Sequence, residues 1–346
     1  MYDFIVVGLG LAGWAFTRVL DENRKRFVVF DPCRDNASTA SAGVYNPVIL
    51  KRFTMAWKAA EFLPYGLLQY RRYEMETGRR FVYPLSIYRK LASAAEQNDW
   101  QAAAGRPGFE QYMDDIRFES FPGIEAPFGF GITKNTGLVD VRALLQTRCR
   151  QLEKRGLLMP EKFDYRKLQI GDNKIRYGEI EARRIVFAEG FGMKRNPFFG
   201  HLPMTGTKGE TLRIHLPYSG WPVIKSNVFL APIPESDEYL TGATYEWVDK
   251  TTVPTDEARK ILTGKLEKLY SGPYTITGQT AGIRPTVKDR RPLLGVHPEY
   301  PGLAVFNGLG TRGLILAPRL AKMLFEHLEF GMDLLPETDI KRWEKP

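Results

Sequence analysis

Two glycine-rich stretches lie near opposite ends of this 346-residue chain, and their spacing suits the binding of a ligand. The first, "GLGLAG" at residues 8–13, has its glycines in GxGxxG spacing, and the second, "GLGTRG", occupies residues 308–313. Each precedes an apolar, helix-like run. Backbone N–H groups in such a loop, together with the positive end of the helix, bind phosphate and other anions. The two stretches therefore predict two places where a phosphorylated or negatively charged group binds.

The first stretch has the sequence context of a dinucleotide site. The strand pattern "YDFIVVG" precedes it, an amphipathic helix follows, and a second strand, "RFVVFD", ends on Asp31, 23 residues beyond Gly8. In such sites Gly8 permits the tight turn, Gly10 admits the pyrophosphate, Gly13 lets the helix pack on the strand, and the acid binds a ribose hydroxyl. The order of strand, loop, helix, strand and acid predicts a dinucleotide site, and it leaves NAD and FAD both open.

Composition and charge argue against several other classes of protein. The net charge is +9, but no block of five or six basic residues occurs, which favours dispersed surface cations over RNA binding. Cys33 and Cys149 are far apart without CxxC spacing, and the four histidines lack ligand spacing. We therefore expect no disulfide framework and no metal site. The apolar stretch from Ile5 to Phe16 is shorter than the ~18 residues of a membrane span. The expected location is the cytoplasm.

The length predicts about two domains. Parallel-type strand and helix segments are interrupted by two pieces rich in aromatic residues or alternating strands. The predicted fold class is α/β, with a Rossmann-like nucleotide-binding domain interleaved with an α+β substrate domain built on an antiparallel sheet. The first domain is predicted to comprise residues 1–79, 136–205 and 276–346, and the second residues 80–135 and 206–275.

Local signals add three expectations. The helix pattern after Met55 is expected to break at Pro64 and to end at Gly78. A hairpin is expected to turn at residues 171–173. Pro318 must fit an early turn of the last helix or kink it.

Four segments resemble one enzyme family. The stretch "TAGIRPTVKDRRPLLGVHPEYPGLAVFNGLGTRGLILAPRLAKML" resembles the C-terminal signature of the D-amino-acid oxidase and glycine oxidase family of FAD oxidoreductases. "SAGVYNP" resembles its flavin-contacting segment, and "RRIVFAEG" its later strand-to-glycine turn. With the first loop, the resemblance spans residues 3–325 and implies FAD as the cofactor. Members with cysteine-linked flavin carry that cysteine near Gly282, so the FAD is expected to be non-covalent.

The resemblance also answers why two glycine loops are present. It implies that the first loop holds the FAD pyrophosphate and that the second lies beside the isoalloxazine ring. N–H groups of the second loop would face the ring edge that becomes negative on reduction. The predicted cofactor-binding residues are Gly8, Gly10, Leu11, Ala12, Gly13, Asp31, Pro32, Ser38, Thr39, Ser41, Ala42, Gly43, Val44, Phe163, Ala188, Gly190, Gly308, Leu309, Gly310, Thr311, Arg312 and Gly313. The segment from Ser38 to Gly43 would equally suit a solvent loop.

Four residues are predicted to take part in catalysis. Arg284, in "GIRP", matches the arginine that clamps the substrate carboxylate in the family, and a guanidinium fork fits a carboxylate in a bidentate pair. The alternative is a structural salt bridge with Asp289. Asn46 and Tyr245 are expected to line the pocket or to be satisfied within the fold, and Arg312 to add charge near the ring or to lie at the surface.

The sequence departs from the family at two positions. Phe229 stands where some glycine-oxidising members carry a tyrosine, which puts small amino-acid substrates in doubt. Glu189, in "FAEG", places a charge where the family prefers a small or hydroxyl residue, and the sequence offers no account of it.

The sequence leaves three functions to be tested. The leading one is oxidation of a small carboxylate-bearing amine, an amino acid or N-alkyl glycine, by hydride transfer to FAD, followed by imine hydrolysis and reoxidation by O2 or another acceptor. The second is tRNA modification, because "GLGTRGL" followed by "APRLA" also resembles the FAD domain of the bifunctional enzyme that trims carboxymethylaminomethyl-uridine. The third is a non-enzymatic FAD-binding protein.

Overall fold

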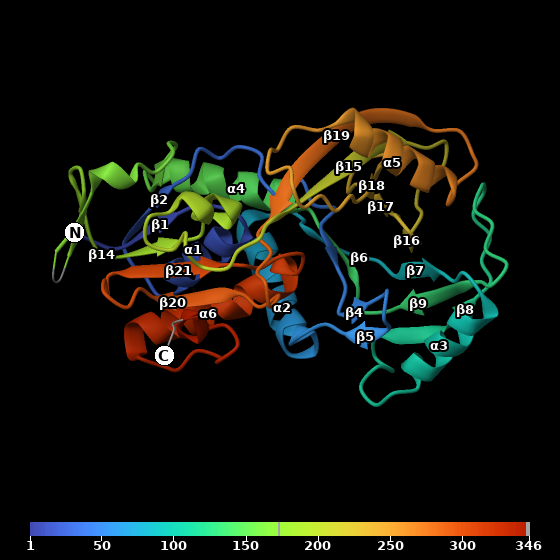
Figure 1. Ribbon diagram of the computed structural model, residues 1–346, viewed down its shortest axis with the longest axis horizontal. Coiled ribbons are helices and arrows are strands. Elements are labelled where there is room, and N and C mark those ends of the chain that lie inside the picture. Colours follow the sequence, from blue (N-terminus) through green and yellow to red (C-terminus); the bar gives the residue numbers. More distant parts are fainter. Residues whose placement is uncertain (172–173, 344–346) are drawn as a thin grey trace. The chain divides into compact units, whose positions relative to one another are not determined.

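The chain divides into two compact units. The computed structural model describes residues 1–171 and 174–343 (Figure 1). Residues 1–39 and 142–207 form the first unit with the chain from Ile283, and residues 40–141 and 208–282 form the second. These boundaries differ from the predicted segments chiefly in placing residues 40–79 in the second unit. The reason is a strand pairing: β3 (Val44–Tyr45) pairs with β10 (Gly137–Val139), and no sequence period reveals such a partner.

The first unit is built on a sheet whose middle strands are parallel. Its order is β11-β2-β1-β14-β21, with β20 antiparallel beside β21 and with β13 and β12 continuing from β14 as antiparallel strands. The bounds are β1 Tyr2–Val7, β2 Phe27–Phe30, β11 Leu158–Met159, β12 Leu168–Ile170, β13 Ile175–Tyr177, β14 Ile180–Phe187, β20 Leu293–Val296 and β21 Leu303–Asn307. The hairpin strands β12 and β13 are present as expected, while Asp172 and Asn173 of the predicted turn lie outside the described residues.

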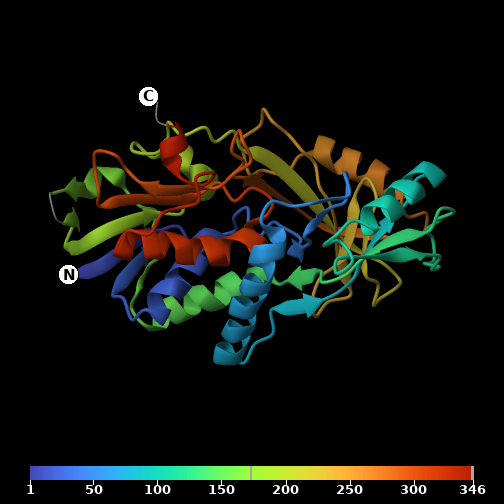
Figure 2. The same cartoon turned by 90° about the horizontal axis from the view of Figure 1, so that it is seen from below.

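Three helices lie side by side on one face of this sheet: α1 (Leu11–Glu22), α4 (Val141–Lys154) and α6 (Gly313–Phe330) (Figure 2). Phe4 of β1 packs between α1 and α6, with ring centroids 5.6 Å from Phe16 and 6.4 Å from Phe325. The alternate residues Ile5 and Val7 point into the apolar cluster on the other face. Short 3-10 helices complete the unit at Tyr165–Lys167, Gly190–Arg195 and Ile340–Trp343.

The second unit contains a sheet of order β19-β15-β18-β17-β16-β7-β9-β8. β16 and β7 are parallel, whereas the pairs from β15 to β16 and from β7 to β8 are antiparallel, which agrees with the predicted antiparallel sheet. Its bounds are β7 Ile87–Lys90, β8 Met113–Arg117, β9 Phe130–Thr133, β15 Thr207–His215, β16 Val223–Lys225, β17 Phe229–Pro232, β18 Glu238–Gly242 and β19 Thr275–Arg284. Smaller pairings join β3, β10 and β6 (Val82–Pro84), and β4 (Val48–Ile49) with β5 (Thr54–Met55). The helices are α2 (Ala59–Thr77), α3 (Ala94–Ala104) and α5 (Asp256–Glu267).

Prolines occur inside two helices without ending them. The predicted break at Pro64 is wrong, because α2 runs through it and ends at Gly78, which has a φ of 66°. A proline removes one intrahelical hydrogen bond, and the buried side chains of Phe62, Leu63 and Tyr70 hold the helix in place. Pro318 likewise lies inside α6. Among residues 1–171 and 174–343, no helix is both long enough and apolar enough to span a bilayer.

The expectation of no disulfide is also wrong. Cys33 and Cys149 are joined, with their Cα atoms 6.5 Å apart across a sequence separation of 116 residues. Cys33 follows β2, and α4, which carries Cys149, leads into β11, the neighbour of β2 in the sheet. The fold therefore brings the two cysteines to the same edge of the first unit.

Candidate dinucleotide and substrate site

The first glycine loop connects β1 to α1 in a conformation that only glycine fits. Gly8 has a φ of +98°, and a Cβ there would lie 2.5 Å from the Ala188 carbonyl oxygen. A Cβ on Gly13 would overlap the Gly8 carbonyl oxygen. The absence of side chains on these glycines lets a ligand approach the N-terminus of α1 at the carboxyl end of the sheet.

Asp31 lies at the same end of the sheet as the first glycine loop. It follows β2, and its two carboxylate oxygens accept hydrogen bonds from the backbone N–H groups of Leu9 and Cys33, both at 2.6 Å. Burial raises the pKa of Asp31, although the two N–H donors act in the opposite direction. Each oxygen keeps a second lone pair, so the carboxylate retains the capacity to accept from a ribose hydroxyl.

Ser38 lies over the first turn of α1. The backbone N–H of Leu11 donates to Ser38 Oγ at 3.4 Å, and a Cβ on Gly10 would be 3.3 Å from that oxygen. Asn36 shapes this segment, since its Oδ1 accepts from the N–H groups of Ser38 (2.9 Å) and Thr39 (3.2 Å). Pro32 precedes the segment at the surface. The predicted contact segment thus begins beside the first loop.

The turn after β14 explains Glu189. The Tyr165 hydroxyl donates to one carboxylate oxygen, and Asn196 Nδ2 donates to the other at 2.8 Å. Burial raises the pKa of Glu189 against the effect of these donors. The acid thus anchors the turn whose backbone, at Ala188, lies against Gly8. Sequence reasoning missed this role because the two partners are 24 and 7 residues away.

Asn307 connects this turn to the second glycine loop, and the sequence analysis did not single it out. The side chain is only 2% exposed. Its Nδ2 donates to the Gly190 carbonyl oxygen, and its Oδ1 accepts from the Gly308 N–H, both at 2.9 Å. The sequence offered one signal for this role, which was an asparagine at the end of a buried strand and directly before "GLG".

The second loop lies beside the first. Gly308 and Gly310 have positive φ values of 74° and 54°. A Cβ on Gly313, the first residue of α6, would lie 2.9 Å from Leu11 Cδ1 at the start of α1. The two loops therefore open from neighbouring helix N-termini, and two positive helix ends face one region. Leu309 is buried, Thr311 is exposed, and Arg312 is the N-cap of α6.

Arg284 ends β19 next to the second loop. The carbonyl oxygen of its neighbour Pro285 accepts a hydrogen bond from Gly310 N–H at 3.2 Å. Asp289, the partner in the alternative reading of Arg284, accepts from Arg342 Nε at 2.9 Å and from the Arg291 N–H at 2.9 Å. The structure therefore pairs Asp289 with Arg342.

The remaining predicted contacts lie in the second unit, except for Phe163. Ser41 is exposed, and Ala42 and Val44 pack against the apolar cluster of Ile87, Leu138, Val223 and Ala231. Gly43 has a φ of 67°, and a Cβ there would overlap the Val139 carbonyl oxygen. Asn46 Oδ1 accepts from the Val48 N–H at 2.9 Å and is thereby used within the fold.

Phe163 contributes its side chain to the core of the first unit. Its ring stacks on Tyr177 at a centroid distance of 4.4 Å and meets Phe30 edge-on at 5.4 Å. This packing accounts for the burial of Phe163.

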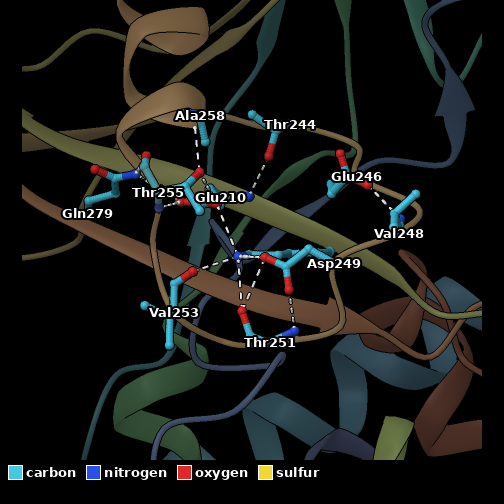
Figure 3. Close-up of polar contacts among 11 residues, drawn as sticks. Glu210, Thr244, Glu246, Val248, Asp249, Thr251, Val253, Thr255, Ala258 and Gln279 are labelled. Carbon is cyan, nitrogen blue, oxygen red and sulfur yellow. Dashed lines mark hydrogen bonds and ion pairs between the residues drawn. The ribbon is translucent and has the colours of Figure 1, made fainter.

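Tyr245 lies on a loop that a buried ionic network holds. Its side chain is 64% exposed. Lys208, 1% exposed in its side chain, forms ion pairs with Asp249 at 2.6 Å and Glu210 at 3.4 Å, and donates to the Val253 carbonyl oxygen (Figure 3). These bonds fix the segment from Thr244 to Thr255 against β15.

Comparison with known proteins agrees with this geometry. Residues 3–327 match the family described as FAD dependent oxidoreductase (DAO), and the chain belongs to that family. It is an FAD-dependent oxidoreductase with the α/β fold of that family, and these expectations from the sequence are confirmed. The glycine cradle, the helix N-termini of α1 and α6 and Asp31 fit such a cofactor.

The proteins that this chain resembles are named for different activities. Glycine oxidase from Pseudomonas aeruginosa is 26% identical over 92% of this chain and 93% of its own length. A tRNA 5-methylaminomethyl-2-thiouridine biosynthesis bifunctional protein from Pseudomonas entomophila is 24% identical over 93% of this chain, which spans 56% of that relative. The fold resembles iminodiacetate oxidase from Chelativorans sp. BNC1, with a TM-score of 0.79 and 19% identity over 97% and 99% of the two chains.

Proposed function

We propose that this enzyme oxidises the C–N bond of a small carboxylate-bearing amine, an amino acid or N-alkyl glycine, and that the resulting imine is hydrolysed. Bound FAD supplies the chemistry by accepting a hydride, and O2 or another acceptor removes the electrons. The observation that carries the proposal is the position of Arg284, one residue from the carbonyl oxygen that accepts from Gly310 in the second loop. The relatives named for glycine and iminodiacetate support the same substrate class.

In this proposal Arg284 binds the substrate carboxylate. A guanidinium matches a carboxylate with two parallel hydrogen bonds, and fixing the carboxylate sets the orientation of the neighbouring carbon. Asp289, the partner in the alternative interpretation of Arg284, is engaged by Arg342. Asn46 and Tyr245 are assigned to the pocket wall, with Asn46 acting through the turn that its side chain closes.

The predicted cofactor contacts remain part of the proposal. The first loop and Asp31 are assigned to the adenosine diphosphate part of non-covalent FAD. Residues 308–313 and Arg312 are assigned to the ring, where the positive end of α6 stabilises the charge that reduction creates.

The test is anaerobic reduction of the flavin, followed by its absorption while single amines are added. The panel contains glycine, sarcosine, D-amino acids, proline, iminodiacetate and the modified-uridine nucleoside. We expect bleaching by at least one small amine, with kcat/KM lowered about a hundredfold or more in Arg284→Ala. Arg284→Lys should recover part of it, and the exposed Arg259→Ala should be unchanged. Bleaching that survives unchanged in Arg284→Ala would refute the assigned role.

A second candidate function is tRNA modification, with an N-alkyl glycine attached to a uridine as the substrate. The similarity to the bifunctional tRNA protein over 93% of this chain and the net charge of +9 favour it. Bleaching by tRNA bearing the modified uridine, without bleaching by any free amine, would establish this candidate and exclude the first.

A further inference from the structure

Backbone N–H groups of the second glycine loop, residues 308–313, are bonded within the protein in alternation. Three bonds make the pattern, and they run from Gly308 to Asn307 Oδ1 (2.9 Å), from Gly310 to the Pro285 carbonyl oxygen (3.2 Å) and from Arg312 to the Leu309 carbonyl oxygen (3.1 Å). Across residues 1–171 and 174–343, the N–H groups of Leu309, Thr311 and Gly313 meet no acceptor. Leu309 and Gly313 are buried, and buried N–H groups in proteins are nearly always paired. The unbonded amides therefore fit an acceptor on a bound cofactor.

The side chain of Asn307 fixes the first bond of this pattern. It is buried at the end of β21, opposite Leu293 of β20 in register. Its Oδ1 accepts from Gly308, whose φ of 74° lies in a region that glycine enters and leaves easily. A side-chain bond, and not a strand or helix, thus orients the Gly308 peptide. Without that bond the peptide is free to turn, and the order of bonded and unbonded N–H groups after it is no longer fixed.

The other end of the Asn307 side chain reaches the turn that supports the first glycine loop. Its Nδ2 donates to the Gly190 carbonyl oxygen at 2.9 Å. Gly190 directly follows Glu189, the acid that anchors this turn. In the same turn the Ala188 carbonyl oxygen would lie 2.5 Å from a Cβ on Gly8. Asn307 therefore links the backbone beneath the first loop to the first peptide of the second loop.

We propose that Asn307 is a positioning residue for reduction of the flavin. Its side chain keeps the unbonded N–H groups of the second loop facing the ligand, at a fixed spacing from the first loop. This inference rests on the assignment of residues 308–313 to the ring, which is part of the proposed function. Reduction places negative charge on the ring edge, and N–H groups bind a charged acceptor more strongly than a neutral one. The alignment by Asn307 therefore favours the reduced flavin and raises the reduction potential.

The test measures the reduction potential of the bound flavin, titrated anaerobically with dithionite against a dye of known potential. Asn307→Leu keeps the approximate size of the side chain and removes both bonds, and Asn307→Ser is a smaller change that cannot make both. In each variant we expect the equilibrium constant for two-electron reduction to fall about tenfold or more, which is about 30 mV or more.

The matched control is Thr17→Val, a buried change in α1 of the same unit. The Thr17 hydroxyl donates to the Trp14 carbonyl oxygen at 3.0 Å and accepts from Arg148 Nε at 3.2 Å. Its loss should lower thermal stability and leave the potential unchanged. An unchanged potential in both Asn307 variants, or an equal fall in Thr17→Val, would overturn the inference.

A second measurement uses the unaltered protein and needs no amine. Amide hydrogen exchange, resolved to single residues, compares the apoprotein with FAD-loaded protein before and after reduction by dithionite. Reduction should slow exchange at Leu309, Thr311 and Gly313 and leave Gly308 unchanged, because its N–H is already bonded to Asn307. Equal slowing at Gly308 would overturn the inference.

The two measurements also separate this inference from the proposed function. If FAD protects no amide of residues 308–313, the assignment of this loop to the ring is refuted, and the inference falls with it. A lowered potential in the Asn307 variants, in a protein that oxidises none of the amines, would refute the proposed function and support the inference.

Discussion

The buried network around Lys208 allows a prediction with a worked magnitude. Lys208→Met keeps the length of the side chain and removes its charge. The Glu210 carboxylate, 3% exposed, then loses the cation 3.4 Å away. Removing one partner of a buried ion pair costs about 3–5 kcal/mol, since the other charge stays buried.

The remaining partners of Glu210 decide where in this range the effect falls. Its oxygens also accept from the Thr255 N–H at 2.9 Å, the Thr255 hydroxyl at 3.0 Å and Gln279 Nε2 at 2.8 Å. These donors continue to stabilise the carboxylate, so we expect a loss of about 3 kcal/mol in the free energy of unfolding. For a unit of this size that corresponds to a fall in Tm of about 6–12 °C.

The assay is thermal unfolding of the FAD-loaded protein followed by circular dichroism. Lys260→Met changes the net charge equally at an exposed site and should shift Tm by less than about 2 °C. Lys208→Met/Glu210→Gln removes both charges and should recover more than half of the loss. Equal shifts in Lys208→Met and Lys260→Met would refute the reasoning, as would a double variant less stable than Lys208→Met.

Two further predictions concern other parts of the molecule. Gly13→Val should yield protein without bound flavin, because the side chain would overlap the Gly8 carbonyl oxygen. The measurement is flavin absorption per polypeptide. Gly264→Ala is the control that should retain flavin, since Gly264 in α5 has open space around it. Reduction of the Cys33–Cys149 disulfide should lower the free energy of unfolding in urea by about 5 kcal/mol, because the bond closes a loop of 116 residues, and Cys149→Ser should no longer respond to reductant.

The nucleotide half of the fold was predictable because its signals are local. The buried strand before Gly8, the glycine spacing and the acid at Asp31 lie within one short segment, and each has a direct physical meaning. The same holds for the second loop, since glycines before an apolar helix indicate an open helix N-terminus wherever they occur. Family resemblance then identified the cofactor, which the spacing alone had left open.

Residues whose roles depend on distant partners were not predictable. Glu189 was unexplained until Tyr165 and Asn196 were found to donate to it. Segment 40–79 was assigned by its position along the chain, whereas its pairing through β3 decides where it packs.

The cysteines show why distance along the chain misled the sequence reasoning. A disulfide framework was excluded because residues 33 and 149 lie far apart along the chain and lack CxxC spacing. In a parallel sheet, however, neighbouring strands are joined by long crossovers, so residues that flank adjacent strands are close regardless of their separation. Cys33 leaves β2, and α4 delivers the chain to β11, whose residues Leu158 and Met159 pair with Val29 and Phe30. Once β11 is placed beside β2, the two cysteines must approach each other. The backbone N–H of Cys33 also donates a hydrogen bond to the Asp31 carboxylate. The disulfide thus fixes the loop that carries the proposed ribose-binding acid, and its reduction should loosen FAD binding as well as lower stability.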